Sequence, residues 1–199
     1  MIIGITGGIA SGKTIVSDYV QKLGYPVVDA DLLAREIMEP GSPVLNEVRK
    51  AFGNTVFNEN GELNRKALAA QIFQDEESRH LLDGLTHPAI RALAEEKFAQ
   101  LKGEHLVFFV VPLLYESGMD ELCDDVWVVH AEESQRKNRL SLRDGIDETY
   151  AQKKIDAQMS AQERLNKGAR VLYNDGDLNH LYKQIESFLK NRKKLQKRC

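Results

Sequence analysis

The sequence predicts an α/β fold, in which a parallel sheet is flanked by helices and interrupted by a helical insertion. A short apolar run at 2–6, a pair of glycines, a helical pattern at 12–23 and a second apolar run at 25–29 together form one βαβ unit. Residues 106–111 are continuously apolar, which is typical of a strand covered on both faces. Residues 32–102 contain helical patterns only. Strands alternating with helices favour a parallel sheet.

The first half of the chain carries clear helix signals. Gly24 suits the position just beyond the end of the first helix. Ser42 followed by Pro43 predicts a helix start, with a cap residue and then proline at the first helical position. Asn60-Gly61 predicts a turn. Further helices are predicted around 67–73 and from His87-Pro88 onward.

The second half completes the sheet. Residues 126–129 and 171–173 are the fourth and fifth predicted strands, and the helical segment 132–167 between them is rich in Arg and Lys. The last helix shows one apolar stripe at helical spacing. The stripe consists of Leu178, Leu181, Tyr182, Ile185 and Leu189.

Composition narrows the class of protein. The 199 residues include 27 Lys+Arg and 30 Asp+Glu, which gives 27 − 30 = −3, and 42% are hydrophobic, enough for one packed domain. The longest apolar run, 106–114, is far shorter than the roughly 20 residues of a membrane-spanning helix. Two cysteines, Cys123 and Cys199, make no disulfide framework. With no signal-peptide pattern, we expect a cytoplasmic protein that does not bind membranes.

The charge is unevenly distributed. Six basic residues lie between Lys190 and Arg198, so the remainder of the chain carries 21 − 30 = −9. An acidic body argues against a nucleic-acid partner. The basic run is read as a solvated helix end, with a nucleic-acid contact as the alternative.

The segment Gly7–Thr14 fits the phosphate-binding pattern G-x-x-x-x-G-K-[ST]. It lies between a predicted strand and a predicted helix, which is the context that confirms such a match. Its glycines allow backbone N–H groups to converge on an anion, and the helix start adds partial positive charge. Lys13 supplies a charge for the β- and γ-phosphates, and the Thr14 hydroxyl can bind Mg²⁺. The sequence therefore predicts ATP or GTP binding.

Two carboxylates follow the second strand. Because the carboxyl ends of parallel strands share one edge of a sheet, we expect Asp29 and Asp31 near the γ-phosphate. A carboxylate there can accept a hydroxyl proton or hold Mg²⁺ through water. The alternative is that one of them only caps the following helix.

The basic segment offers two arginines at helical spacing. Arg139 and Arg143 are four residues apart and share one helix face. Two guanidinium groups on one face suit a transferring phosphoryl group, so we read the segment as a lid. A solvated helix face is the alternative.

The chain resembles the dephospho-coenzyme A kinases over nearly its whole length. The phosphate loop alone is common to very many proteins, but its combination with the other segments is selective. The segments that carry the resemblance are Ile5–Ile9, Val28–Asp31 with Ala34-Arg35, 63–73, His87-Pro88, Val111–Glu116, Arg139-x-x-x-Arg143-Asp144 and Tyr173–Gly176.

The resemblance implies a P-loop kinase fold with five parallel strands. Its core would be 1–31, 103–131 and 168–199, with a helical acceptor-binding insertion at 32–102 and a helical lid at 132–167. It also implies transfer of the γ-phosphoryl group of ATP, with Mg²⁺, to the ribose 3′-hydroxyl of dephospho-coenzyme A. This is the last step of coenzyme A biosynthesis. The chain would be a monomer or a weak homo-oligomer.

The same resemblance assigns residues. Asp31 would be the general base, Asp29 a supporting carboxylate, Lys13 and Arg139 charge-stabilising groups and Thr14 the metal ligand. The ATP site would comprise Gly8, Ile9, Ala10, Ser11, Gly12, Lys13, Thr14, Ile15, Arg139, Arg143 and Asn174. The acceptor site would comprise Asp31, Arg35, His87 and Glu116. For His87, a helix start before Pro88 is the competing interpretation.

The loop departs from the family pattern at two places. Ala10 stands where the family usually has glycine, and Thr14-Ile15 where it often has Ser-Thr. If residue 10 needs a positive φ, the extra methyl costs roughly 1 kcal/mol. Thr14 keeps the hydroxyl, so we expect metal binding to be retained.

A phosphate loop is also compatible with two other functions. Another P-loop small-molecule kinase, acting on a nucleoside or nucleotide, would differ mainly in the helical insertion. A nucleotide-dependent switch is disfavoured because the chain has no guanine-specificity segment of the Asn-Lys-x-Asp kind.

Overall fold

A computed structural model describes residues 1–167 and 170–196, which form two compact units. The first unit comprises residues 1–28 and 101–199, and the second comprises residues 29–100. The predicted insertion, 32–102, lies almost wholly in the second unit. Its acceptor-binding role, and the role of 132–167 as a lid, stay predictions.

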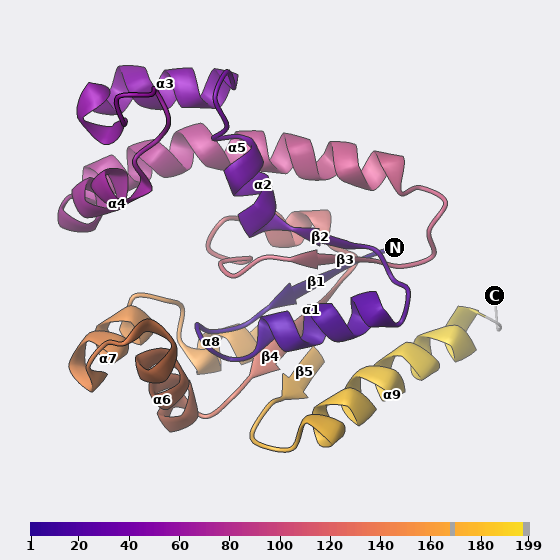
Figure 1. The fold of residues 1–199 in the computed structure, drawn as a ribbon. Helices are drawn as coiled ribbons and strands as arrows, with labels where there is room; N and C mark the ends of the chain where they lie inside the picture. Colours follow the sequence, from indigo (N-terminus) through magenta and orange to yellow (C-terminus); the bar gives the residue numbers. More distant parts are fainter. Residues whose placement is uncertain (168–169, 197–199) are drawn as a thin grey trace. The chain divides into compact units, whose positions relative to one another are not determined.

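A parallel sheet is the centre of the first unit (Figure 1). Its strands are β1 (Ile2–Thr6), β2 (Val27–Asp29), β3 (Val107–Val110), β4 (Asp125–His130) and β5 (Arg170–Tyr173), in the order β2-β3-β1-β4-β5. The middle strand, β1, pairs in parallel with β3 and β4, so that Ile3 lies opposite Phe108 on one side and Asp125 on the other. The five predicted strands and their parallel arrangement are confirmed.

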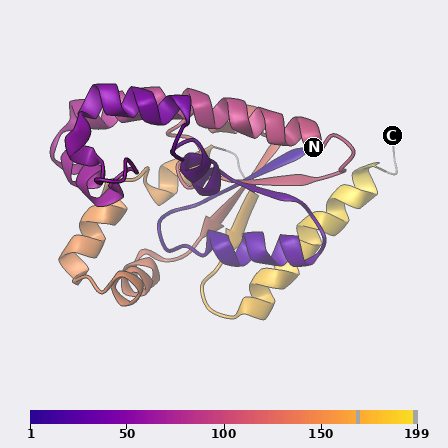
Figure 2. The same ribbon diagram turned by 45° about the horizontal axis from the view of Figure 1, so that its top comes forward.

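Helices flank this sheet. In the first unit they are α1 (Lys13–Lys22), the short η2 (Met119–Leu122), α6 (Glu133–Asp144), α7 (Glu148–Asp156), α8 (Ala161–Asn166) and α9 (Leu178–Gln196). Figures 1 and 2 both show α1 and α9 beside each other, covering one face of the sheet. α1 follows β1 directly after the glycine loop, as the βαβ pattern predicted.

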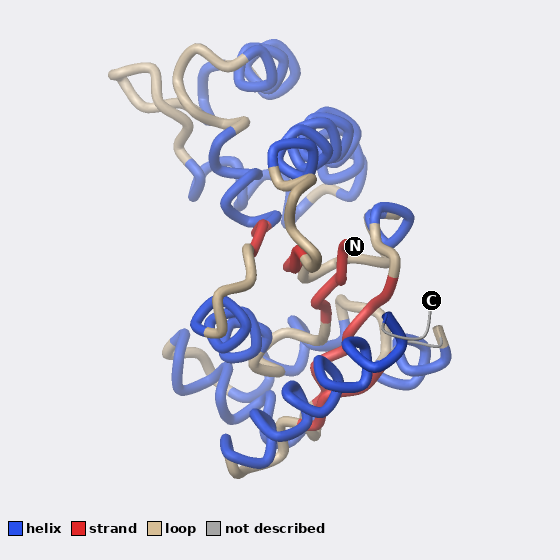
Figure 3. Tube along the Cα trace, turned by 90° about the vertical axis from the view of Figure 1, so that its right-hand side faces the viewer, coloured by secondary structure: helices blue, strands red, loops and turns tan. Residues whose placement is uncertain are grey.

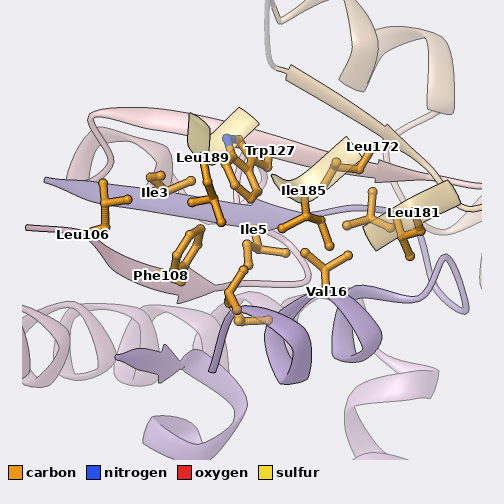
Figure 4. Close-up of a cluster of buried hydrophobic side chains, with 13 residues drawn as sticks. Ile3, Ile5, Val16, Leu106, Phe108, Trp127, Leu172, Leu181, Ile185 and Leu189 are labelled. Atoms are coloured by element: carbon orange, nitrogen blue, oxygen red, sulfur yellow. The ribbon is translucent and has the colours of Figure 1, made fainter. Parts of the chain in front are cut away.

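The main core lies between the sheet and these two helices (Figure 4). Alternate residues of each strand point into it, because successive side chains of a strand face opposite ways. Its fully buried members include Ile3, Ile5, Val16, Val20, Phe108, Trp127, Leu172, Leu181 and Ile185. The rings of Phe108 and Trp127 meet edge to face with their centroids 5.2 Å apart. Phe109, which points to the other face of β3, is also fully buried, as expected for a strand covered on both sides.

The apolar stripe of α9 is one residue shorter than predicted. Leu181, Ile185 and Leu189 are buried, but Leu178 is 43% exposed. Leu178 is the first residue of the helix, and helical side chains tilt toward the N-terminus. It therefore points beyond the helix start and away from the core.

The second unit is helical (Figure 3). It contains α2 (Ala30–Glu36), α3 (Pro43–Phe52), the short η1 (Asn54–Val56), α4 (Arg65–Gln74) and α5 (Glu76–Gln100). Ser42 caps α3 as predicted, since its side chain accepts a hydrogen bond from Leu45 N–H at 3.1 Å. The predicted turn at Asn60-Gly61 closes through Gly61 N–H and the Asn58 carbonyl, with N and O 2.9 Å apart.

The predicted helix start at His87-Pro88 is wrong. α5 begins at Glu76 and runs through Pro88 to Gln100. The side chain of Asp75 accepts hydrogen bonds from the N–H groups of Glu77 and Ser78, which supplies the actual start. Proline inside a helix removes one backbone hydrogen bond, but Thr86, Ile90 and Ala94 are all buried along one face and hold the helix together across it.

Most of the basic run, and Cys199, lie where the structure does not describe side chains. α9 extends to Gln196, but the side chains of residues 191–199 lie outside the described residues. Within the part of the chain that the structure describes, no helix combines the length and the apolar character needed to cross a membrane.

We expect Leu181→Ala to lower the free energy of unfolding by about 2–5 kcal/mol, because it opens a cavity in a fully buried site. Leu178→Ala is the matched control on the same helix and should change stability by about 0.5 kcal/mol or less. Chemical denaturation of both variants measures the two effects. Equal losses would contradict the assignment of Leu178 to the surface.

Candidate active site

The phosphate loop joins β1 to α1 through backbone conformations that suit glycine. Gly7 and Gly12 have φ angles of 153° and 101°. A Cβ on Gly7 would lie 2.3 Å from the carbonyl oxygen of Val129 on β4, so no larger residue fits there. Among the described non-glycine residues, only Ala10 has a positive φ, at 60°. The expectation of a strained alanine is confirmed, and roughly 1 kcal/mol of conformational cost is held in the loop.

Asn174 supports the loop from the end of β5. Its side chain is buried, and its Nδ2 donates to the Ser11 carbonyl at 2.7 Å. The same nitrogen would be 2.1 Å from a Cβ on Gly12, so the second glycine is also needed for space. Asn174 was predicted as an ATP-site residue. The structure shows that its amide nitrogen bonds the loop backbone.

Lys13 is the first residue of α1 and folds over the loop. Its Nζ donates to the carbonyl oxygens of Gly7 at 2.8 Å and Gly8 at 3.1 Å. Both contacts are to backbone groups at the start of the loop. The ammonium group is therefore held at the loop itself, where a bound phosphate chain would meet it.

Arg139 reaches the same region from α6. Its Nη2 donates to the Asn174 carbonyl at 3.0 Å and to Gln135 Oε1 at 3.2 Å. Its Nη1 is buried and has no hydrogen-bond partner among the described residues. A buried guanidinium nitrogen without an acceptor retains a donor for an anion.

Arg143 is placed differently from Arg139. It pairs with its neighbour Asp144, with Nε 2.7 Å from Oδ1, and this hydrogen bond raises the pKa of Arg143. The same bond, with help from Lys154, lowers the pKa of Asp144. The two arginines therefore have different partners in the structure. A phosphate contact of Arg143 stays a prediction.

Two buried arginines were not selected from the sequence. Arg136 on α6 is 5% exposed and Arg164 on α8 is 2% exposed, and burial lowers the pKa of each. An Arg136 nitrogen would be 1.9 Å from a Cβ on Gly8, so this side chain lies directly against the loop. Both arginines line one pocket with Gly8 and the end of β4. Arg136 lies four residues before the apolar Leu140, so the two share one helix face. This spacing was the signal in the sequence that Arg136 points inward.

Glu116 is joined to the segment before α8. Its Oε1 accepts from Met159 N–H at 3.2 Å and lies 3.7 Å from an Nη of Arg164. These bonds fix the carboxylate within the first unit. The predicted acceptor contact of Glu116 stays a prediction.

Four of the predicted site residues belong to the second unit. Asp29 caps α2, because its carboxylate accepts from Asp31 N–H at 2.8 Å, so the capping interpretation is confirmed for this residue. Asp31 and Arg35 lie exposed on α2. His87 lies in the interior of α5, with Nε2 3.7 Å from Asp83 Oδ1, so its helix-start interpretation is wrong.

A divalent metal ion would meet few protein ligands here. Among the described residues, no group of three or more His, Cys, Asp or Glu could hold a metal. Thr14 is exposed at the start of α1 and offers one hydroxyl. This donor set fits an ion such as Mg²⁺, which is bound mainly by substrate phosphates and water with one or two protein oxygens.

A phosphate loop between the middle strand and the first helix of a parallel sheet, with arginines of a helical segment against it, defines a P-loop kinase. The family model for dephospho-CoA kinase matches residues 1–180. The chain belongs to the dephospho-CoA kinase family, whose members are phosphotransferases.

Individual relatives agree over almost the full length. The dephospho-CoA kinase of Syntrophotalea carbinolica is 44% identical over 191 residues, covering 95% of this chain and 90% of that protein. The enzyme of Acinetobacter baylyi is 42% identical, covering 96% and 97%. Among solved structures, TT1252 from Thermus thermophilus is 33% identical with a TM-score of 0.84 and covers 96% and 97% of the two chains. The dephospho-CoA kinase from Campylobacter jejuni is 25% identical with a TM-score of 0.73 and covers 98% of both.

We expect Asn174→Ala to lower the free energy of unfolding by about 1–3 kcal/mol, because it leaves the buried Ser11 carbonyl without its donor. ATP affinity should fall as well, since the loop loses a support. Denaturation and ATP titration measure the two effects. Asn138→Ala, at an exposed site on α6, is the control, and a wild-type result for Asn174→Ala would contradict the supporting role.

Proposed function

We propose that the chain transfers the γ-phosphoryl group of ATP to the ribose 3′-hydroxyl of dephospho-coenzyme A, giving coenzyme A and ADP in the last step of coenzyme A biosynthesis. The observation that carries this proposal is the family match over residues 1–180, together with an intact phosphate loop. We place the activity in the cytoplasm and expect a monomer or a weak homo-oligomer. Another P-loop nucleoside or nucleotide kinase is not favoured, because three relatives that are 41%, 44% and 42% identical to this chain are dephospho-CoA kinases.

The phosphate loop binds the nucleotide in this proposal. Backbone N–H groups at the start of α1 surround the β- and γ-phosphates, while the Ile9 N–H stays bonded to Gln158, and Ile15 lies in the first turn behind the phosphates. Lys13 exchanges its loop carbonyls for phosphate oxygens, since charge-assisted hydrogen bonds to phosphate are the stronger ones. Thr14 would hold Mg²⁺, which when bound neutralises charge on the phosphates.

Arginines stabilise the charge of the transferring group. Arg139 brings a guanidinium whose buried Nη1 has no hydrogen-bond partner among the described residues, which supports its assignment to the phosphoryl group. Arg143 would assist only after breaking its two hydrogen bonds to Asp144, so its assignment has less support than that of Arg139.

The acceptor hydroxyl needs a proton acceptor. In the transfer, the 3′-oxygen forms a bond to the γ-phosphorus, the bond from that phosphorus to the β–γ bridging oxygen breaks, and ADP leaves. We assign the departing hydroxyl proton to Asp31, which lies in the first turn of α2 just after β2, while Asp29 orients the start of α2 by capping it. Arg35, His87 and Glu116 are proposed for the acceptor's own charged groups.

ADP release measured with Mg²⁺ and ATP, with and without dephospho-coenzyme A, tests the function. We expect release to depend strongly on the acceptor, and the product mass to increase by one phosphoryl group. A folded sample that binds ATP but ignores this acceptor would refute the substrate assignment and leave the P-loop kinase fold in place.

We expect Lys13→Ala and Arg139→Ala each to lower kcat about 100-fold or more, by loss of one charge-stabilising donor. Thermal unfolding of both variants should show that they remain folded. Lys22→Ala, at the far end of α1, is the matched lysine control and should turn over normally. Near-normal turnover in either test variant would remove that residue from the mechanism.

A further inference from the structure

Gln158 contacts the phosphate loop from a distant part of the chain. Its Oε1 accepts a hydrogen bond from the backbone N–H of Ile9 at 2.7 Å, across 149 positions of sequence. Gln158 lies between α7 and α8, outside every residue so far assigned to the site. The N–H group that it uses belongs to the third residue of the loop, not to the start of α1.

Two hydrogen bonds fix the backbone of Met159, the residue after Gln158. Met159 N–H donates to Glu116 Oε1 at 3.2 Å, and the Met159 carbonyl accepts from Arg164 Nη2 at 2.8 Å. Arg164 is almost fully buried and lies 3.7 Å from the same Glu116 oxygen. Ser160 then starts α8 with a capping box that includes Glu163. The contacts of Glu116 and of the buried Arg164 with Met159 thus fix the backbone next to Gln158.

A small apolar cluster also contacts Ile9, together with the next loop residue, Ala10. Leu140 of α6 and Ala151 and Ile155 of α7 are buried together, and Ile9 and Ala10 pack against them. Ala10 is the residue with φ of 60°, a conformation that alanine adopts at a cost. The methyl group that creates this strain therefore also makes an apolar contact that offsets part of it.

We propose that Gln158 is a positioning residue of the nucleotide site, which holds the Ile9–Ala10 peptides in the shape that binds ATP. The inference rests on the proposed function in taking ATP as the ligand. A loop already held in its bound shape loses less conformational freedom on binding, so affinity rises without a direct ligand contact. The segment from α6 to α8 and the phosphate loop then act as one packed unit.

The test replaces the hydrogen-bond acceptor with a side chain of similar length. We expect Gln158→Met to weaken ATP binding about 5-fold by calorimetric titration, the effect of one net hydrogen bond. Hydrogen exchange of the Ile9 amide should become faster in the same variant, with or without nucleotide. Gln162→Met is the matched control, because the Gln162 side chain donates to Asn166 within α8 at 2.8 Å, and it should change neither quantity.

A second variant separates the hydrogen bond from side-chain shape. A carboxylate also accepts from an N–H group, so Gln158→Glu should keep the Ile9 amide as slowly exchanging as in the wild type. Fast exchange in Gln158→Glu, equal to that of Gln158→Met, would overturn the proposal. So would wild-type ATP affinity in Gln158→Met.

The outcomes distinguish this inference from the proposed function. If the wild-type chain binds ATP and Gln158→Met binds it equally well, only the positioning role fails. If the wild-type chain does not bind ATP, the proposed function fails, and the positioning role fails with it.

Discussion

The structure depends on one constraint, which is that backbone N–H groups must converge on an anion directly after a buried strand. Positive φ angles at Gly7, Ala10 and Gly12 produce the required turn. The carbonyl of Val129 on β4 leaves no room for a side chain on Gly7, so the loop packs directly against β4 at this residue. A loop of this kind satisfies few of its own polar groups, and its shape is therefore maintained by other elements.

Those elements come from widely separated parts of the chain. Asn174 bonds the Ser11 carbonyl from the end of β5, and Gln158 bonds the Ile9 N–H from the segment before α8. Arg136 lies against Gly8 from α6. The sheet brings these contributions together because the loop after its middle strand is next to the ends of the strands beside it.

Electrostatics at the loop favours a negatively charged ligand. Arg136 and Arg164 are buried and each lies near one carboxylate, Glu133 at 3.9 Å and Glu116 at 3.7 Å. Lys13 donates to the carbonyl oxygens of Gly7 and Gly8, and Arg139 donates to that of Asn174, so two further cationic groups lie at the loop. Phosphoryl transfer needs positioning and charge stabilisation more than covalent chemistry, and this arrangement supplies both.

Local features were predictable from the sequence alone. The five strands, the position of the phosphate loop and the Ser42 cap each follow from a few neighbouring residues, because strand periodicity and capping act over short distances. The strain at Ala10 was expected from the resemblance to a family that usually has glycine at this position. The passage of α5 through Pro88, the exposure of Leu178, the inward placement of Arg136 and the Gln158–Ile9 bond required the tertiary structure. For Pro88, Arg136 and Gln158, burial or a partner far away in the chain decided the outcome, whereas Leu178 is exposed because it lies at the start of its helix. Partners from distant parts of the chain also hold the shape of the loop of residues 7–14.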